Sequence, residues 1–217
     1  MSDDEMPELS STALAALAEF REEERRKNEE LLRGDTKSAK IDEDWQLSQF
    51  WYDEATSRRL VDEALATKCS NIACVSSPTL MQFFHETQEY KNGEISLKVF
   101  EFDTRFGLKF PDEFVFYDYK KPTEIPKQLL GAFDLVIADP PFLAAECLIK
   151  TSHTVRLIGK PDVKVILCTG AIMDDYIFRN FQASRLLGMH RTSFEPHHAN
   201  NLANDFACFA NYPTKTL

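Results

Sequence analysis

The pattern of hydrophobic and polar positions changes near residue 71, where short apolar runs begin to alternate with helix-like stretches. Apolar runs that stay apolar throughout are typical of strands buried on both faces of a parallel sheet, and strict alternation is typical of half-buried strands. Runs of strand length occupy residues 71–76, 95–103, 113–118, 133–138 and 163–168. The pattern therefore predicts an α/β protein with these five strands.

Helical patterns separate most of the predicted strands. Residues 146–158 and 171–187 have helical periodicity, and Ser77-Pro78 predicts a helix start, because proline lacks the N–H that a first turn leaves unpaired. Residues 189–195 and 206–212 have no helix between them and predict an antiparallel hairpin. The expected fold is a doubly wound, mostly parallel seven-stranded sheet that ends in a C-terminal antiparallel hairpin.

Two segments precede this alternation. Residues 1–40 predict a flexible or helical extension, whose helix is capped near residues 10–12 and either faces solvent or docks a partner. Residues 45–52 are dense in large rings, which either pack on the edge of the core or cap a ligand pocket, with Gln49 and Tyr52 supplying polar contacts. We therefore expect one domain over residues 41–217.

The net charge of −10 is unevenly distributed along the chain. Residues 1–44 hold 14 acidic and 7 basic side chains, whereas the rest of the chain holds 21 and 18. The predicted domain is therefore only mildly acidic, and it lacks the broad basic stripe typical of proteins that bind duplexes tightly. A nucleic-acid partner is accordingly disfavoured.

The cysteines and the first residues of the chain predict the cellular compartment of the protein. The five cysteines show no CxxC spacing, and the histidines His190, His197 and His198 show no metal-ligand spacing with acids or cysteines. We expect buried thiols in a reducing compartment and no metal. The start is acidic and lacks a secretory pattern, and no apolar run reaches membrane-spanning length. These features predict a cytoplasmic protein with no membrane partner, and leave its oligomeric state open.

The most informative stretch is the end of the run at residues 133–138. Asp139 follows this strand, and Pro140 and Pro141 then stop the ladder, because neither has an N–H to donate. Phe142 adds a flat ring. A carboxylate, carbonyls with no competing local N–H and an aromatic face together predict a stiff corner that can bind an amine.

Acids also follow the neighbouring predicted strands. Asp103, with Glu101 close by, follows the second strand, and Asp118 follows the third. One such acid alone would indicate ordinary turn or cap chemistry. The carboxyl ends of strands in an open α/β sheet share one crevice, so three acids in order, ending at Asp139, favour a ligand site. An acid past the second strand suits a ribose diol, and one past the third suits adenine.

The first turn of the predicted sheet narrows the choice of cofactor. Residues 75–79 contain no GxGxxG, and the chain has no P-loop, so NAD, FAD and ATP are disfavoured. A nucleoside without phosphates, such as S-adenosylmethionine, tolerates this turn better. Ser76 in this turn is then a candidate contact of the cofactor.

The order of strands and Asp139-Pro140-Pro141-Phe142 resemble the class I S-adenosylmethionine-dependent methyltransferases that carry an [Asn/Asp]-Pro-Pro-[Phe/Tyr] motif. Four further segments are similar to the eukaryotic family that methylates a lysine of translation elongation factor 1-alpha, formerly classed as N6-adenine-specific DNA methyltransferases. The likeness covers about residues 40–212. The chain departs from the wider superfamily by lacking a glycine-rich first loop. The four segments are residues 45–52, 114–119, 167–173 and 200–206.

The resemblance implies a protein-lysine N-methyltransferase that uses S-adenosylmethionine and acts on elongation factor 1-alpha. In this interpretation Asp139 and the carbonyl of Pro140 accept the amine's N–H groups, Pro141 stiffens the corner, and Phe142 packs against positive charge. The lysine proton leaves either to Asp139 or to solvent. The expected cofactor-binding residues are Gln49, Tyr52, Ser76, Glu101, Asp103, Asp118 and Asp139.

Two other functions stay open at this point. The first is an N6-adenine methyltransferase for DNA or RNA, because the same corner can hold either kind of amine. No separate target-recognition domain for a flipped base is visible, which favours a protein substrate. The second is a non-catalytic scaffold that keeps the fold and binds a nucleoside. The target lysine and the number of methyl groups transferred do not follow from the sequence.

Overall fold

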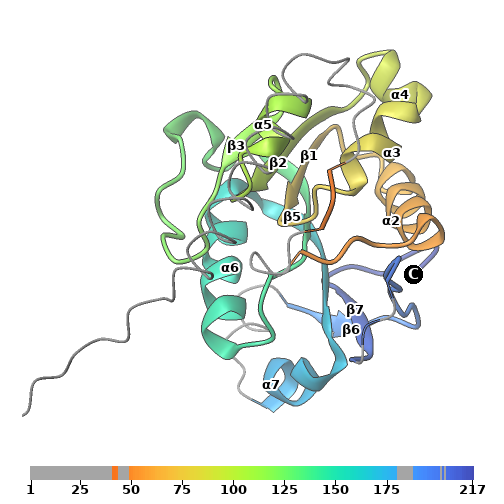
Figure 1. The fold of residues 1–217 in the computed structure, drawn as a ribbon, viewed down its shortest axis with the longest axis vertical. Helices are drawn as coiled ribbons and strands as arrows, with labels where there is room; N and C mark the ends of the chain where they lie inside the picture. Colours follow the sequence, from red (N-terminus) through yellow and green to blue (C-terminus); the bar gives the residue numbers. More distant parts are fainter. Residues whose placement is uncertain (1–40, 44–48, 180–187, 201, 203) are drawn as a thin grey trace, which may run out of the picture. The chain divides into compact units, whose positions relative to one another are not determined.

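The computed structural model describes residues 41–43, 49–179, 188–200, 202 and 204–217 of the chain (Figure 1). Residues 42–217 form one compact unit. The predicted extension over residues 1–40 and part of the ring-rich segment, residues 44–48, lie outside the described residues.

The described strands form a seven-stranded sheet in the order β3-β2-β1-β4-β5-β7-β6. Strands β1 to β5 pair in parallel, whereas β7 runs antiparallel to β5 and to β6. The predicted fold class and its C-terminal hairpin are thus confirmed. The strands are β1 (Asn71–Val75), β2 (Ser96–Glu101), β3 (Phe114–Phe116), β4 (Phe133–Ala138), β5 (Gly159–Gly170), β6 (His190–Arg191) and β7 (Phe206–Ala210).

Helices cover both faces of the sheet. Figure 1 shows α2 and α3 on the opposite side of the sheet from α6, as the connections of a doubly wound sheet require. The helices are α2 (Glu54–Ala66), α3 (Leu80–Glu86), α4 (Gln88–Lys91), α5 (Arg105–Lys109), α6 (Ala145–Ile158) and α7 (Asp174–Arg179), with 3-10 turns η2 (Lys127–Leu129) and η3 (Ala171–Met173).

The central strands are buried on both faces, as their apolar runs predict. Ala73 and Val75 of β1 belong to the core cluster that includes Leu148 and Val155 of α6. Because side chains alternate along a strand, Ile72 and Cys74 point to the other face, and both are fully buried. This rigid centre holds the carboxyl ends of β1 and β4 side by side, because the two strands are paired in register from Ile72 and Leu135 onward.

Two predicted helices differ from the observed ones. The turn at Ser77-Pro78 precedes α3 and does not start it: the N–H of Leu80 donates to the carbonyl of Ser77 at 3.3 Å, and the helix begins at Leu80. The predicted helix over residues 171–187 begins as the 3-10 turn η3 and continues as α7 to Arg179. Residues 180–187 lie outside the described residues.

Candidate active site

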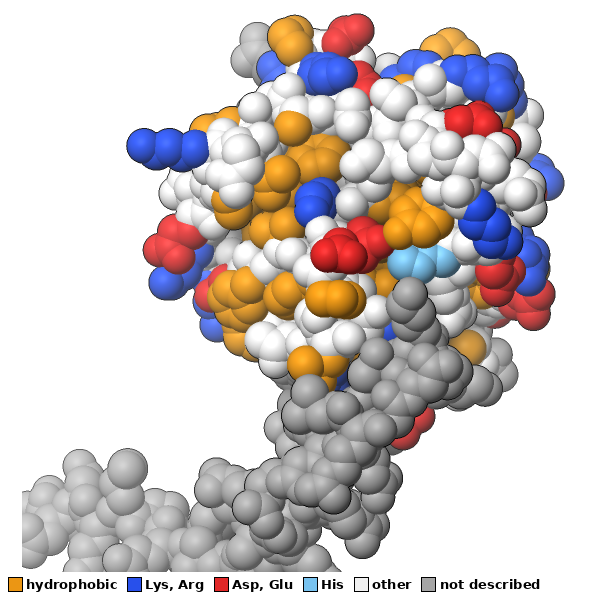
Figure 2. All heavy atoms as spheres, turned by 90° about the horizontal axis from the view of Figure 1, so that it is seen from above, with side chains coloured by type: hydrophobic (Ala, Val, Ile, Leu, Met, Phe, Trp, Pro, Cys, Tyr) orange, Lys and Arg blue, Asp and Glu red, His pale blue; other side chains and the backbone are white. Residues whose placement is uncertain are grey.

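A pocket of about 470 Å³ opens at the carboxyl ends of the parallel strands. Its walls come from the turns after β1 to β4, from residues 49–52 and from the segment before β7. Figure 2 shows a face on which hydrophobic side chains gather around acidic side chains and a histidine, the same mixture of side chains that lines the pocket. The predicted crevice is therefore present as one cavity.

The corner after β4 forms one wall of this pocket. The N–H of Asp139 donates to the carbonyl of Val75 at 2.9 Å, which ties the corner to the neighbouring strand β1. Asp139, Pro140, Pro141 and Phe142 all line the pocket. The Phe142 side chain is 40% exposed, and its ring centre lies 5.5 Å from that of Tyr119. The corner therefore presents a carboxylate and an aromatic face to the same cavity.

The Asp139 carboxyl group is half-buried, because it lies in the concave wall of the pocket. Burial raises its pKa to about 7, the charge of Glu101 adds to the increase, and the hydroxyl of Tyr52 partly opposes it. Asp139 is thus a stronger proton acceptor than an ordinary aspartate, whose pKa is about 3.9. A cation bound beside Asp139 would lower this pKa again, because it favours the charged carboxylate.

The side chain of Tyr52 lies next to the Asp139 carboxyl group. Its side chain is 4% exposed and lines the pocket, and its hydroxyl lies beside Asp139 and Cys168. Among the described residues the hydroxyl has no hydrogen bond of good geometry. Burial, with Asp139 second, raises the pKa of Tyr52 well above its usual value, so the hydroxyl remains a donor. A buried, unsatisfied donor that faces the pocket is available to a ligand or to Asp139.

The raised pKa of Asp139 predicts that the ligand-free protein loses stability as the pH rises. The folded state keeps a proton on Asp139 up to about pH 7, whereas the unfolded chain releases it near pH 4. This contribution is therefore complete below about pH 4 and is lost through about pH 7. Between pH 5 and pH 8 wild type should lose on the order of 2 kcal/mol more unfolding free energy than Asp139→Asn, measured by urea titration. Equal losses in the two proteins would contradict the assignment.

Glu101 is the last residue of β2, and it lines the pocket. Its Oε1 accepts hydrogen bonds from the backbone N–H groups of Phe102, at 2.8 Å, and Asp103, at 3.1 Å. Burial raises the pKa of Glu101 to about 7. Since both of these hydrogen bonds go to Oε1, the second carboxyl oxygen remains available to a ligand in the pocket.

Asp118 lines the pocket past β3, as the sequence predicts. Its Oδ1 accepts a hydrogen bond from the N–H of Lys120 at 2.9 Å, which fixes the turn. Ser76 lines the pocket past β1 with a φ of 53°, a left-handed conformation usually reserved for glycine. The first turn thus reaches a glycine-like conformation without a glycine, and this could not be read from the sequence.

Asp103 does not line the pocket, so the geometry does not support it as a direct cofactor contact. Its carboxylate accepts hydrogen bonds from the side chains of Arg105 and Gln49 and from the N–H of Arg105. Gln49 does line the pocket, but its amide donates to Asp103 and accepts from Arg105. Of the two acids near the end of β2, Glu101 is therefore the one placed for a ligand.

His198, which shows no metal-ligand spacing in the sequence, lines the pocket. His198 packs against Tyr52 and Phe206, with ring centres 5.2 and 4.2 Å apart. Burial lowers the pKa of His198 to about 4, so this ring is neutral at pH 7. Within the described ranges, no group of His, Cys, Asp or Glu has the arrangement of a metal site.

A family model and two curated proteins match nearly the whole of residues 42–217. A family model described as probable N6-adenine methyltransferase matches residues 43–214. A Caenorhabditis elegans protein-lysine N-methyltransferase is 64% identical over 225 residues, which cover 100% of both chains. The human protein named EEF1A lysine methyltransferase 1 is 43% identical over 215 residues, which cover 98% of this chain and 95% of the human one.

Among solved structures, a Thermus thermophilus branched-chain polyamine synthase resembles this fold with a TM-score of 0.55. The match covers 85% of this chain and 62% of the other, at 10% identity, and so bears on the fold alone. The family model and the two relatives span nearly all of residues 42–217. The chain therefore belongs to the family described as probable N6-adenine methyltransferase, and its worm and human relatives carry the names of protein-lysine methyltransferases.

Proposed function

We propose that residues 41–217 form an S-adenosylmethionine-dependent methyltransferase that methylates a lysine side chain of translation elongation factor 1-alpha. One observation carries the proposal: the amine-binding corner, Asp139 to Phe142, opens into the same pocket as the strand-end acids Glu101 and Asp118. The names of the worm and human relatives support a lysine as the acceptor, and the human name supports elongation factor 1-alpha.

The pocket fits S-adenosylmethionine in size and in charge. Its volume of about 470 Å³ lies within the range of roughly 300–1,000 Å³ for small-molecule sites. Glu101 and Asp118 line the pocket, and the proposal has the second carboxyl oxygen of Glu101 accept from a ribose diol and Asp118 contact an adenine edge. Among the described pocket residues there are three acids against one basic side chain, Lys120. Such a site favours a cation, and the cofactor supplies a methyl group on a positively charged sulfur.

The corner's own groups can orient the lysine nitrogen. Asp139 and the carbonyl of Pro140 can accept its N–H groups, and the missing N–H groups of Pro140 and Pro141 leave those carbonyls without a local competitor. The face of Phe142 can hold positive charge with about 0.5–2 kcal/mol of cation–π attraction. Held by these groups, the nitrogen would present its lone pair to the methyl group that the cofactor would supply when bound. Positioning of this kind is the main work of the protein.

The lysine ammonium must lose a proton before it can act as a nucleophile. Asp139 can take that proton, because burial holds its pKa above that of an ordinary aspartate before a cation binds. Even with an Asp139 pKa of about 7, the gap to a free lysine, whose pKa is about 10.4, corresponds to roughly 5 kcal/mol. Removal of the lysine from water lowers its own pKa and narrows the gap. Loss of the proton to solvent before entry stays the alternative route.

The second candidate function is N6-adenine methylation, which the family description favours. The acidity of the pocket argues against it, because nucleic acids are bound chiefly through cationic contacts to phosphates. Purified protein should be given methyl-labelled cofactor with elongation factor 1-alpha, duplex DNA or RNA in parallel. The proposal expects label in the protein alone. Label in DNA or RNA would support the adenine function, and absence of cofactor binding would support a scaffold.

We also propose that the protein is located in the cytoplasm. All five cysteines are free thiols, and four of them are buried in the fold. Unpaired cysteines are typical of reducing compartments, in which an elongation factor also works. No helix of the described part of the chain is long and apolar enough to cross a bilayer.

A further inference from the structure

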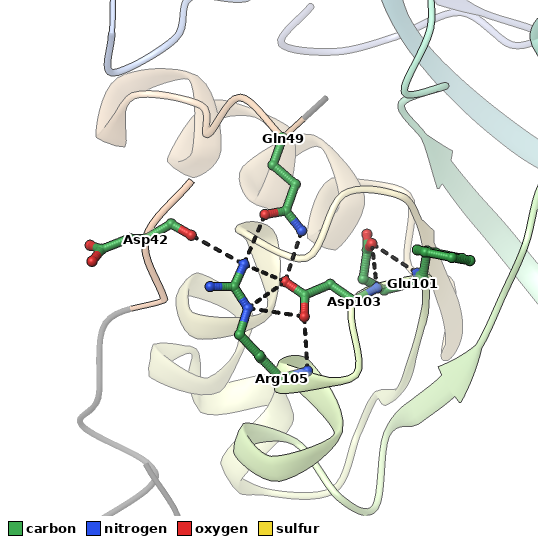
Figure 3. Close-up of polar contacts among 6 residues, drawn as sticks. Asp42, Gln49, Glu101, Asp103 and Arg105 are labelled. Carbon is green, nitrogen blue, oxygen red and sulfur yellow. Dashed lines mark hydrogen bonds and ion pairs between the residues drawn. The ribbon is translucent and has the colours of Figure 1, made fainter. Parts of the chain in front are cut away.

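A cluster of polar side chains lies behind the pocket, between the end of β2 and the segment before α2 (Figure 3). Arg105 is its centre. The Arg105 Nε lies 3.0 and 2.9 Å from the two carboxyl oxygens of Asp103, and its Nη2 lies 2.7 Å from Oδ2. The same Nη2 donates to the side-chain oxygen of Gln49 at 3.1 Å and to the backbone carbonyl of Asp42 at 3.3 Å.

Asp103 closes the cluster from the other side. Its Oδ2 accepts a hydrogen bond from the Gln49 amide nitrogen at 2.8 Å, so Gln49 is held at both its nitrogen and its oxygen. The Asp103 side chain is only 4% exposed and that of Arg105 22%. A carboxylate–guanidinium pair with this fork geometry is strong and directional, and its shielding from solvent reduces screening.

The segment held by this cluster is the pocket wall, residues 49–52, all of which line the pocket. On the side of the segment before β7, the backbone carbonyl of Trp51 accepts a hydrogen bond from the N–H of Ala199 at 2.8 Å, and Tyr52 forms an isolated β-bridge with His198. On the side of α5, Asp103 and Arg105 hold Gln49 by hydrogen bonds. The ring of Trp51 packs edge-on against Phe106, the residue after Arg105. The start of α5 therefore fixes the wall at two points.

We propose that Arg105 and Asp103 are positioning residues, which set the affinity for S-adenosylmethionine by holding the pocket wall in place through Gln49 without contacting the cofactor. The inference rests on the proposed function, because it concerns the cofactor pocket of that activity. Neither residue lines the pocket, so a direct contact does not account for such an effect.

A double-mutant cycle on cofactor affinity tests this arrangement. Calorimetry should give the Kd of S-adenosylmethionine for wild type, Gln49→Ala, Arg105→Ala and the double variant. Each single change should weaken binding about tenfold, or about 1.4 kcal/mol. The double variant should bind no more than about twofold weaker than the weaker single variant, because both changes break the same link. Effects that multiply would show that Arg105 does not act through Gln49 and would overturn the inference.

Further measurements separate positioning from a general loss of structure. The KM for the cofactor should rise in both single variants, while kcat at saturating cofactor and the KM for the protein substrate stay within about twofold. Arg105→Lys should recover only part of the affinity, since an ammonium cannot reproduce the planar fork. Because Arg105→Lys keeps a cation beside Asp103, it tests the proposal even if Arg105→Ala folds poorly.

A matched control lies on α2. Arg58 forms exposed ion pairs with Glu54 and Glu86, and Arg58→Ala should leave cofactor affinity unchanged. Wild-type affinity in both single variants would overturn the inference and leave the proposed function standing. Absence of cofactor binding by wild type would instead overturn the proposed function and the inference with it.

Discussion

Replacing Asp139 with alanine should reduce kcat about 100- to 1,000-fold and leave the Kd of S-adenosylmethionine within about threefold of wild type. The magnitude follows from the usual worth of a positioned group that accepts a proton or an N–H from the reacting atom. Asp139, Glu101 and Asp118 all line the pocket, and in the proposed arrangement Asp139 binds the amine whereas Glu101 and Asp118 bind the cofactor. The loss should therefore fall on the chemical step, measured by kinetics at saturating cofactor.

Two further variants sharpen this prediction. Asp139→Asn keeps a carbonyl acceptor but not the charge, so its loss should be smaller, and its kcat should no longer rise with pH through the pKa of Asp139. Asp134→Asn is the matched control, because Asp134 lies at the other end of the same strand, where it pairs with Lys160. An equal loss of kcat and of cofactor affinity in Asp139→Ala would place Asp139 in the cofactor site and contradict its role as amine acceptor.

Replacing Glu101 with alanine should weaken cofactor binding about 100-fold, with a much smaller effect on kcat at saturation. Two hydrogen bonds from a diol to a carboxylate are worth about 1.5 kcal/mol or more each, and about 2.7 kcal/mol corresponds to a factor of 100 in Kd. The change also removes the acceptor for the N–H groups of Phe102 and Asp103. Calorimetry gives the affinity, and a melting curve reports the cost to the turn.

Glu101→Gln separates these two effects. The amide oxygen can still accept from both backbone N–H groups, while the second oxygen is replaced by a donor. We expect near wild-type stability and a loss of affinity of about tenfold, since a ribose hydroxyl can accept from the amide. Wild-type affinity in Glu101→Gln and Glu101→Ala would move the ribose contact away from Glu101 and leave Asp118 as the next acid to test.

The sequence was most informative where function depends on where strands end. The apolar run of β4 predicts a central strand, and the proline pair predicts its stop, so the pattern alone places Asp139 at the edge of the sheet. The same reasoning placed Asp103, with Glu101 close by, and Asp118 on that edge, and of these Glu101 and Asp118 line the pocket. Strand ends are local features of a chain, and the parallel order of the sheet then brings them together.

Asp103 shows the limit of that reasoning. Glu101 and Asp103 stand two positions apart and would face the same side if the strand continued, so the pattern alone could not separate them. The chain turns at Phe102 and enters α5, and Asp103 accepts a hydrogen bond from the N–H of Arg105 at 2.9 Å. Its role in the turn is the ordinary one for an acid at a helix start.

The link between Gln49 and Arg105 could not be predicted from the sequence at all. The two residues are 56 positions apart, and their contact depends on how the segment before α2 crosses the end of β2. The same is true of Tyr52, whose hydroxyl meets Asp139 only after the sheet has formed. Local periodicity carries no information on such contacts. The ring-rich composition of residues 45–52 did predict that the segment either packs on the edge of the core or caps a ligand pocket, and residues 49–52 line the pocket.

The most direct test of the central claim is to identify the atom that receives the methyl group. Elongation factor 1-alpha should be incubated with S-adenosylmethionine and either wild type or Asp139→Ala, digested, and sequenced by tandem mass spectrometry. The account predicts methyl groups on the side-chain nitrogen of a lysine with wild type and very few with the variant. Unmodified lysines in that protein, together with N6-methyladenine in nucleic acid treated in the same way, would contradict it.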